Sequence, residues 1–261
     1  MNKALSVIIV NYRSKNFLNT CLASLYSLYE NKVLEVIIFN NDKNEDLADI
    51  INKFPQTKIL DERTNIGFGS AHNKAEKIAQ GKYLLLLNPD TEIISGLERA
   101  LELFEQNINL GIIGANLTTQ TGATQPWIAG VSPGLFDLLK NNCGIIASKR
   151  IWESKETLPA DWVSGGAMFV RRDVFKKISG FDENFFMYFE DIDFCKRARA
   201  IKAEIRYCPA IKIKHVGGGS FKSKKEQKTL YYTSQDYFFQ KHFGKNKARL
   251  LQLMRKLCCL T

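Results

Sequence analysis

The sequence predicts an α/β protein in which a mostly parallel sheet is flanked by helices and a basic helical segment follows. Three observations support this fold class. Short apolar runs alternate with segments in which apolar residues recur at helical spacing. The run at 83–87 is wholly apolar, which is typical of a parallel strand buried on both faces. From residue 222 onward, lysine and arginine are frequent and apolar residues are spaced as in an amphipathic helix.

The first half of the chain is expected to alternate regularly between strands and helices. Apolar runs predict strands at 5–10, 34–39, 58–60, 83–87 and 111–117. Helical spacing predicts four helices: one capped by Ser14 and reaching Leu28, one through Leu47–Ile51, one ending near Gly81, and one capped by Ser95 and ending near Gln106. This alternation implies a parallel sheet with right-handed crossovers.

The second half is expected to be less regular. Residues 118–162 are rich in glycine, proline, asparagine and tryptophan, and a loop of this length in a compact domain is usually functional. After it we expect a strand at 162–170, a short helix capped by Asp173, a helix from Glu190 to about Ala200, and short strands at 204–207 and 211–214.

Composition and charge narrow the class of partner. The chain has 261 residues, enough for one large α/β domain with a helical appendage. Its net charge of +10 favours a polyanionic partner, either nucleic acid, an anionic membrane surface or a phosphorylated substrate. The basic residues form no nucleic-acid recognition motif, so nucleic acid is not expected.

Cysteine usage and the N-terminus suggest a cytoplasmic protein. The six cysteines form no CxxC pair and are expected to be reduced, mostly buried thiols. The first three residues lead directly into a strand, so no signal peptide is expected. No apolar run approaches the ~20 residues that span a bilayer.

The tripeptide Asn88-Pro89-Asp90 directly follows the apolar run at 83–87. In open α/β sheets, ligands bind outside the carboxyl ends of such strands. A carboxylate there is well placed to hold a hard cation against a phosphate, because Mg²⁺ typically takes one or two carboxylates together with phosphates and water. Asp90 is therefore the first candidate metal ligand.

Three carboxylates, Glu190, Asp191 and Asp193, lie in the first turn of a predicted helix. Acids are common at helix N-termini for electrostatic reasons, which is the alternative explanation. An aromatic-rich segment, 181–189, precedes them, and an apolar wall raises the pKa of a carboxyl group and suits it to act as a general base. We expect Asp191 to be the base, and Glu190 or Asp193 to orient it or to bind acceptor hydroxyls.

His215 follows a strand and precedes the glycine run 217–219 and Ser220. A glycine run lets backbone amides approach an anion closely. His215 could share a metal with Asp90 or donate to a diphosphate oxygen, and a purely structural histidine is the alternative. We expect His72 and His242 to be structural.

The segment Asn65–Gly69 has two glycines but lacks the third glycine of a dinucleotide-binding motif, and it follows the third strand instead of the first. No Walker lysine pattern occurs either. Asn65, Gly67 and Asn73 better suit close backbone packing around a ribose or base.

The order of these motifs resembles the inverting glycosyltransferases of family two, especially bacterial rhamnosyltransferase-like members, over about residues 4–220. The motifs are Asn11-Tyr12, Asn40-Asn41, Asn65–Gly69 with Asn73, Asn88–Asp90, Gly165–Ala167, Phe181–Glu183, Glu190-Asp191 and His215. The family has the GT-A fold, a Rossmann-like arrangement that agrees with the α/β prediction.

The resemblance implies roles for individual residues. Asp90 matches the second acid of the family's metal-binding DxD motif, with Asn88 in place of the first, and His215 matches a histidine near the metal, Mg²⁺ or Mn²⁺. Asp191 matches the catalytic base. The implied nucleotide-sugar-binding residues are Asn11, Asn40, Asn65, Gly67, Gly69, Asn73 and Asn88. The implied acceptor-side or orienting residues are Glu190, Asp193, Gly166 and Ala167. Asn40 stands where an aspartate usually contacts the base, and an amide can still pair with a pyrimidine edge.

The resemblance also implies an activity: metal-dependent transfer of a hexose to a glycan or lipid-diphosphate-linked acceptor in bacterial cell-surface polysaccharide synthesis. Rhamnose from dTDP-rhamnose is the preferred donor and UDP-hexoses are the alternative. A non-catalytic or regulatory nucleotide-sugar-binding module is the rival function, and the presence of both Asp90 and Asp191 argues against it.

Two units are expected. Residues 1–221 would form the GT-A domain, with a nucleotide-binding half at about 1–117 and an acceptor half at about 118–221. Residues 222–261 would form the basic amphipathic segment, which either packs on the domain or contacts anionic lipid at the inner face of the cytoplasmic membrane.

Overall fold

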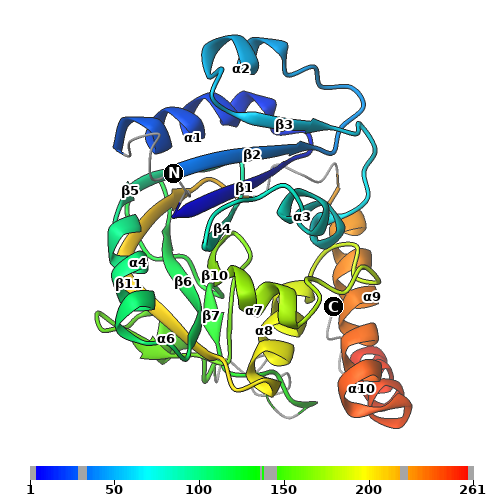
Figure 1. Ribbon diagram of the computed structural model, residues 1–261. Coiled ribbons are helices and arrows are strands. Elements are labelled where there is room, and N and C mark those ends of the chain that lie inside the picture. Colours follow the sequence, from blue (N-terminus) through cyan, green and yellow to red (C-terminus); the bar gives the residue numbers. More distant parts are fainter. Residues whose placement is uncertain (1–3, 29–33, 136, 138–145, 218–222, 258–261) are drawn as a thin grey trace.

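The computed structural model describes residues 4–28, 34–135, 137, 146–217 and 223–257. Within these residues, one sheet contains nine strands in the order β3-β2-β1-β4-β10-β6-β11-β5, with β8 paired to β11 (Figure 1). The strands are β1 Leu5–Asn11, β2 Leu34–Asn40, β3 Lys58–Asp61, β4 Tyr83–Leu87, β5 Thr91–Ser95, β6 Leu110–Thr118, β8 Leu158–Pro159, β10 Ala167–Arg171 and β11 Glu204–His215. A small second sheet pairs β7 Ala129–Gly130 with β9 Trp162–Val163.

Helices cover this sheet. They are α1 Lys15–Leu28, α2 Ala48–Lys53, α3 Phe68–Glu76, α4 Leu97–Gln106, α6 Lys149–Trp152, α7 Arg172–Lys177, α8 Glu190–Ala200, α9 Lys224–Phe243 and α10 Lys245–Leu257. Helix α3 packs on β1 and β2, and α4 packs on β6 and β11. The α/β fold class is thus confirmed.

The first four strands in the sheet order, β3, β2, β1 and β4, are parallel, as the alternation of apolar runs predicts. β1, β2 and β4 are buried along their whole length, because helices cover the sheet on both faces. Their carboxyl ends therefore share one edge. This edge carries Asn11, Asn40 and Asn88.

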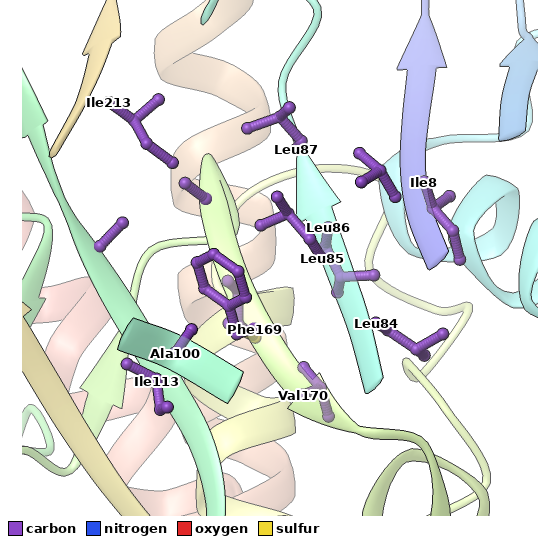
Figure 2. Packing of buried hydrophobic residues seen from close by; sticks show 14 of the residues in the cluster. Ile8, Leu84, Leu85, Leu86, Leu87, Ala100, Ile113, Phe169, Val170 and Ile213 are labelled. Atoms are coloured by element: carbon purple, nitrogen blue, oxygen red, sulfur yellow. The ribbon is translucent and has the colours of Figure 1, made fainter. Parts of the chain in front are cut away.

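The core continues into the second half of the chain. Figure 2 shows Phe169 of β10 between the leucines of β4 and Ile113 of β6. All of these side chains are fully buried, and burial of each stabilises the fold by about 1.5–3 kcal/mol. The core thus joins the predicted nucleotide-binding half to the predicted acceptor half.

Several predicted elements of the second half differ from those observed. The strand expected at 162–170 is two strands, β9 and β10, separated by a turn at 164–166. The two strands expected at 204–207 and 211–214 are one strand, β11, whose pairing register with β6 shifts between Cys208 and Lys212. Pro209 lies at the shift, where a residue without an N–H cannot continue the ladder. β10 is antiparallel to both neighbours, so the parallel pattern is interrupted there.

Three predicted helix caps are wrong. Ser95 belongs to β5, and the residue before α4 is Gly96, with a φ of 97°. Asp173 lies inside α7. Ser14 makes no side-chain bond to the α1 amides. Instead, Glu45 accepts hydrogen bonds from the Ser14 and Lys15 N–H groups, at 3.2 Å each.

The C-terminal segment folds as two helices joined at Gly244 (φ 87°). The two helices lie side by side at the C-terminal end of the chain (Figure 1). α9 and α10 share an apolar cluster with Phe185 and Phe189, which precede α8 in the sequence. The boundary expected at 221 lies outside the described residues, as do Cys143, Cys258 and Cys259. The other three cysteines are buried free thiols. In the part of the chain that is described, no helix combines the length and the apolar character needed to cross a bilayer.

Candidate active site

A cavity of about 1020 Å³ opens at the carboxyl edge of the sheet. Its walls come from the ends of β1 and β4, the 164–166 turn, the start of α8 and the inner side of α9. Of the residues predicted from sequence, Asn65, Gly67, Asn88, Asp90, Gly166, Glu190, Asp191 and His215 line it. The strand ends therefore bring together residues that lie up to 150 positions apart in the chain.

The pairing of β5 with β11 places His215 beside Asp90. Thr91 is the register partner of His215, so the histidine lies next to the 88–90 segment. The His215 Nε2 atom is 3.3 Å from Asp90 Oδ1 and 3.2 Å from Asn88 Nδ2. Strand β5 was not predicted, and without it the closeness of these residues could not be inferred from sequence spacing.

Backbone and imidazole groups hold the Asp90 carboxylate. Gly217 donates its N–H to Asp90 Oδ2 at 2.9 Å, and Val216 donates to the Asp90 carbonyl at 3.0 Å. Burial alone would raise the pKa of Asp90, but His215, when its Nε2 carries a proton, and the Gly217 N–H lower the pKa below its ordinary value. Asp90 is thus a fixed anion. The remaining glycines of the predicted run, and Ser220, lie outside the described residues.

Gln125 is a site residue that sequence reasoning missed. Its Oε1 atom is 2.9 Å from His215 Nδ1, and its Nε2 donates to the His215 carbonyl at 2.8 Å. It lies in the long segment with weak periodicity, where no local pattern distinguishes one polar residue from another.

Asp191 lies at the start of α8 and faces the cavity. Its Oδ2 accepts from Gly165 N–H at 3.1 Å and its Oδ1 from Ile192 N–H at 2.8 Å. Burial raises the pKa of Asp191 above its ordinary value, in spite of these two donors. The carboxylate is therefore oriented and suited to accept a proton.

Glu190 is the buried neighbour of Asp191. Its Oε2 atom has no hydrogen-bond partner among the described residues. Burial first, and then the negative charge of Asp191, raise the pKa of Glu190 well above its ordinary value.

Tyr188 and Phe189, just before Glu190, have positive φ angles of 70° and 63°. Bulky residues rarely adopt this backbone conformation outside functional or strongly held segments.

Asp193 does not face the cavity, which corrects its predicted acceptor-side role. Its fully buried carboxylate contacts Arg197 at 2.7 Å, Lys241 at 2.6 Å and His242 at 2.7 Å. Two of these partners belong to α9, so Asp193 joins α8 to the C-terminal helices. Asp193 comes two residues after Asp191 in α8, so the two side chains point to different sides of the helix.

The predicted nucleotide-binding residues divide into two groups. Asn65, Gly67 and Asn88 lie on the cavity wall. Asn41, which was not predicted as a site residue, lies there too, and its Nδ2 donates to Asn65 Oδ1 at 3.1 Å. Asn11 and Asn40 lie beneath them, fully buried: Asn11 Nδ2 donates to Asn40 Oδ1 at 3.0 Å. The Asn40 amide also donates to Asp61 and to the Glu45 carbonyl, so it is occupied within the protein.

Gly69, Asn73 and Ala167 do not line the cavity. Asn73 clamps the turn before α8: its amide donates to the Phe181 carbonyl at 2.9 Å, and its Oδ1 accepts from the Phe181 N–H at 2.8 Å. A Cβ at Gly69 would lie 2.8 Å from the Phe181 Cβ, so this glycine permits the same packing. Ala167 is buried in β10. These residues lie outside the cavity wall and shape the fold around the site.

Aromatic residues also contribute to the wall. Tyr12, Trp127 and Trp162 line the cavity, and none of them was predicted as a site residue. Trp127 is 43% exposed and packs on Trp152 with a ring separation of 5.1 Å. From α9, Tyr231 and Gln227 also face the cavity, so the C-terminal helices are part of its wall.

Comparisons with known proteins give consistent results. The sequence pattern described as "Glycosyl transferase family 2" matches residues 6–179, and that described as "N-terminal domain of galactosyltransferase" matches residues 148–217. The low-salt glycan biosynthesis hexosyltransferase Agl10 of Haloferax volcanii is 27% identical over 215 residues, covering 81% of this chain and 66% of the relative. The N-acetylglucosaminyl-diphospho-decaprenol L-rhamnosyltransferase of Mycobacterium tuberculosis is 25% identical over 238 residues, covering 82% of this chain and 76% of the relative.

Solved structures share the fold. TarS 1–349 of S. aureus aligns with a TM-score of 0.63 at 17% identity, over 90% of this chain and 64% of that chain. GalNAc-T7 with UDP, GalNAc and Mn²⁺ aligns with a TM-score of 0.67 at 13% identity, over 99% of this chain and 57% of that chain. This chain therefore spans about two thirds or less of the length of these two structures.

Proposed function

Because the chain belongs to glycosyl transferase family 2, we propose that it is an inverting glycosyltransferase that moves a sugar from a nucleotide-sugar donor to an acceptor hydroxyl. One observation carries this proposal: Asp90 and Asp191 line the same cavity at the carboxyl edge of the sheet. Asp90 is held as an anion and can bind a cation that pairs with the departing diphosphate. The raised pKa of Asp191 suits its carboxylate to remove the proton of the acceptor hydroxyl.

Asp90 and His215 fit a divalent cation, Mg²⁺ or Mn²⁺. A carboxylate oxygen and an imidazole nitrogen lie 3.3 Å apart at the cavity wall, and both side chains are half-buried. Among the described residues, no group of three or more His, Cys, Asp or Glu side chains could hold a metal ion by itself, so diphosphate and water would complete the shell. The Mn²⁺ in the GalNAc-T7 structure supports the same metal class. When bound, the cation neutralises charge on the departing diphosphate.

Asp191 is the proposed general base. Gly165 and Ile192 hold its carboxylate through their N–H groups, so its orientation is fixed before substrate arrives. It takes the proton of the acceptor hydroxyl as the oxygen attacks the anomeric carbon in line with the bond to the diphosphate. That bond breaks as the new glycosidic bond forms, and the configuration at the anomeric carbon inverts.

For the donor we propose dTDP-rhamnose, and for the acceptor a glycan or a lipid-diphosphate-linked sugar. The name of the mycobacterial relative, a rhamnosyltransferase with a decaprenol-diphosphate acceptor, supports both. A UDP-hexose is the competing donor, since the WfaP glucosyltransferase of Escherichia coli is 35% identical over 88 residues and uses UDP-Glc by name. The acceptor class also fits a role in cell-surface polysaccharide synthesis.

We also propose that α10 contacts an anionic membrane surface from the cytoplasmic side. Leu250 and Leu253 are 49% and 56% exposed on this helix. The basic residues Lys245, Lys247 and Arg249 share the same helix. Exposed leucines beside lysine and arginine are the pattern of a helix that lies in a lipid interface.

The test is a donor screen followed by a transfer assay. The purified chain is heated with dTDP-rhamnose, UDP-glucose and UDP-N-acetylglucosamine, each with and without Mn²⁺. The true donor should raise the melting temperature in the presence of metal. It is then incubated with N-acetylglucosaminyl-diphosphoryl lipid, and NMR of the product should show an inverted anomeric centre. Binding without transfer would favour the rival function, a nucleotide-sugar-binding module, and retention of configuration would overturn the mechanism.

A further inference from the structure

Gln125 makes two reciprocal contacts with His215 across 90 positions of sequence. Its Nε2 donates to the His215 carbonyl at 2.8 Å, and its Oε1 lies 2.9 Å from His215 Nδ1. A carbonyl oxygen can only accept, so the first contact fixes which end of the amide is the NH₂ group. The other end is therefore an oxygen, and an oxygen at 2.9 Å requires His215 Nδ1 to carry a proton.

The second ring nitrogen, Nε2, has two neighbours that favour opposite states. Asn88 Nδ2 lies at 3.2 Å and can donate to a bare nitrogen. Asp90 Oδ1 lies at 3.3 Å and would accept from a protonated one. A proton on Nε2 would let His215 pair with Asp90, and the lone pair that a metal requires would be lost.

We propose that Gln125 is a positioning residue that sets the tautomer of His215 and so keeps its Nε2 lone pair directed toward Asp90. Metal-ligating histidines commonly donate their other N–H to a fixed acceptor, and loss of that acceptor typically costs 10–100-fold in metal affinity. Gln125 supplies this acceptor here. It also ties the backbone of His215 to the 118–128 segment, so ring and main chain are held by one side chain.

This inference rests on the metal role proposed for His215, but the tautomer can be measured without metal, donor or acceptor. The chain has three histidines, so the ring nitrogens are resolvable by ¹⁵N–¹H NMR of the full-length protein. Spectra are recorded at pH about 8, above the ordinary histidine pKa of about 6.5, and His215 is assigned by its absence in His215→Asn. We expect a protonated Nδ1 and a bare Nε2. A protonated Nε2 in the wild-type protein would overturn the inference before any variant of Gln125 is made.

Two variants separate tautomer control from simple packing. Gln125→Leu fills a similar volume without an acceptor, and we expect a protonated Nε2 signal to appear for His215. Gln125→Glu keeps an acceptor for Nδ1–H but cannot donate to the carbonyl, and we expect the wild-type tautomer. An unchanged tautomer in Gln125→Leu would refute the inference. If Gln125→Leu does not fold, the tautomer of His215 in the wild-type and Gln125→Glu spectra still tests the inference, because a protonated Nε2 in either protein would contradict it.

Metal affinity gives a second readout. Mn²⁺ alone is titrated against each protein and followed by water proton relaxation. The dissociation constant should rise 10–100-fold in Gln125→Leu and stay within about threefold of wild type in Gln125→Glu. Equal affinities for Mn²⁺ in wild type and Gln125→Leu would contradict the role. If wild type itself binds no Mn²⁺ but shows the expected tautomer, then the proposed metal site fails and the assignment of Gln125 to the tautomer stands.

Discussion

Replacing Asp191 by asparagine separates its proposed chemistry from its structural contacts. The carboxylate accepts two backbone hydrogen bonds, from Gly165 and from Ile192. An asparagine can still accept one of them, but its NH₂ group would face the other N–H. The structural cost is therefore about one hydrogen bond, roughly 1 kcal/mol, or a fall of about 2–4 °C in melting temperature for a chain of this size.

The catalytic cost should be much larger. Loss of a general base lowers a rate by about 10²–10⁴, which corresponds to about 3–5 kcal/mol of transition-state stabilisation. We therefore expect Asp191→Asn to reduce kcat by that factor with the donor that the screen identifies. Donor affinity should stay within about twofold, because the variant leaves Asp90 and the Asn41–Asn65 wall intact.

The assay is steady-state transfer to the lipid-diphosphate acceptor, with donor Kd measured separately by calorimetry. Asp173→Asn is the matched control: its carboxylate is exposed, pairs with Lys177 at 3.3 Å and lies away from the cavity. It should retain full kcat. Wild-type turnover in Asp191→Asn, or an equal loss in Asp173→Asn, would refute the assignment of the base.

Three further predictions follow from the same geometry. Asp90→Ala should weaken donor binding in the presence of Mn²⁺ at least tenfold and leave the metal-free affinity nearly unchanged, as measured by calorimetry; equal loss with and without metal would contradict the metal role. Glu190→Gln should raise the melting temperature at about pH 8 and not at about pH 4. A carboxyl whose pKa is raised by folding contributes stability that is fully present below its unfolded pKa and is lost as the pH rises through its folded pKa, and glutamine removes the cost of the buried charge at high pH. A lower melting temperature of the variant at pH 8 would show that the fold does not disfavour the ionised form of Glu190. The double variant Leu250→Ser, Leu253→Ser should reduce co-sedimentation with anionic phosphatidylglycerol vesicles several-fold and leave transfer to a soluble acceptor unchanged, whereas undiminished sedimentation would exclude α10 as the contact.

The carboxyl edge of the sheet was predictable because its signals are local. The apolar run before Asn88 indicates a buried parallel strand, and the ends of parallel strands meet at one edge. Asp90 and Asp191 could thus be placed near one site from residue order and family resemblance. His215 was found for the same reason, since it ends a strand.

The remaining site residues depend on contacts that no local pattern encodes. Asp193 resembles Asp191 in sequence context, but its charge is satisfied by Lys241 and His242 of α9. Asn73 was expected to contact ligand, and its amide instead holds Phe181, 108 positions away. Gln125 lies in a segment without periodicity, so only the fold shows that it meets His215. In each case a long-range partner decides the role of a polar side chain.

We propose that one bound donor lies between Asp90 and Asp191. A crystal structure of the Asp191→Asn protein with its intact donor and Mn²⁺ tests this most directly. We expect manganese density in contact with Asp90, His215 and the donor diphosphate, with the anomeric carbon facing residue 191. Density for the sugar on the far side of the metal, away from residue 191, would contradict it.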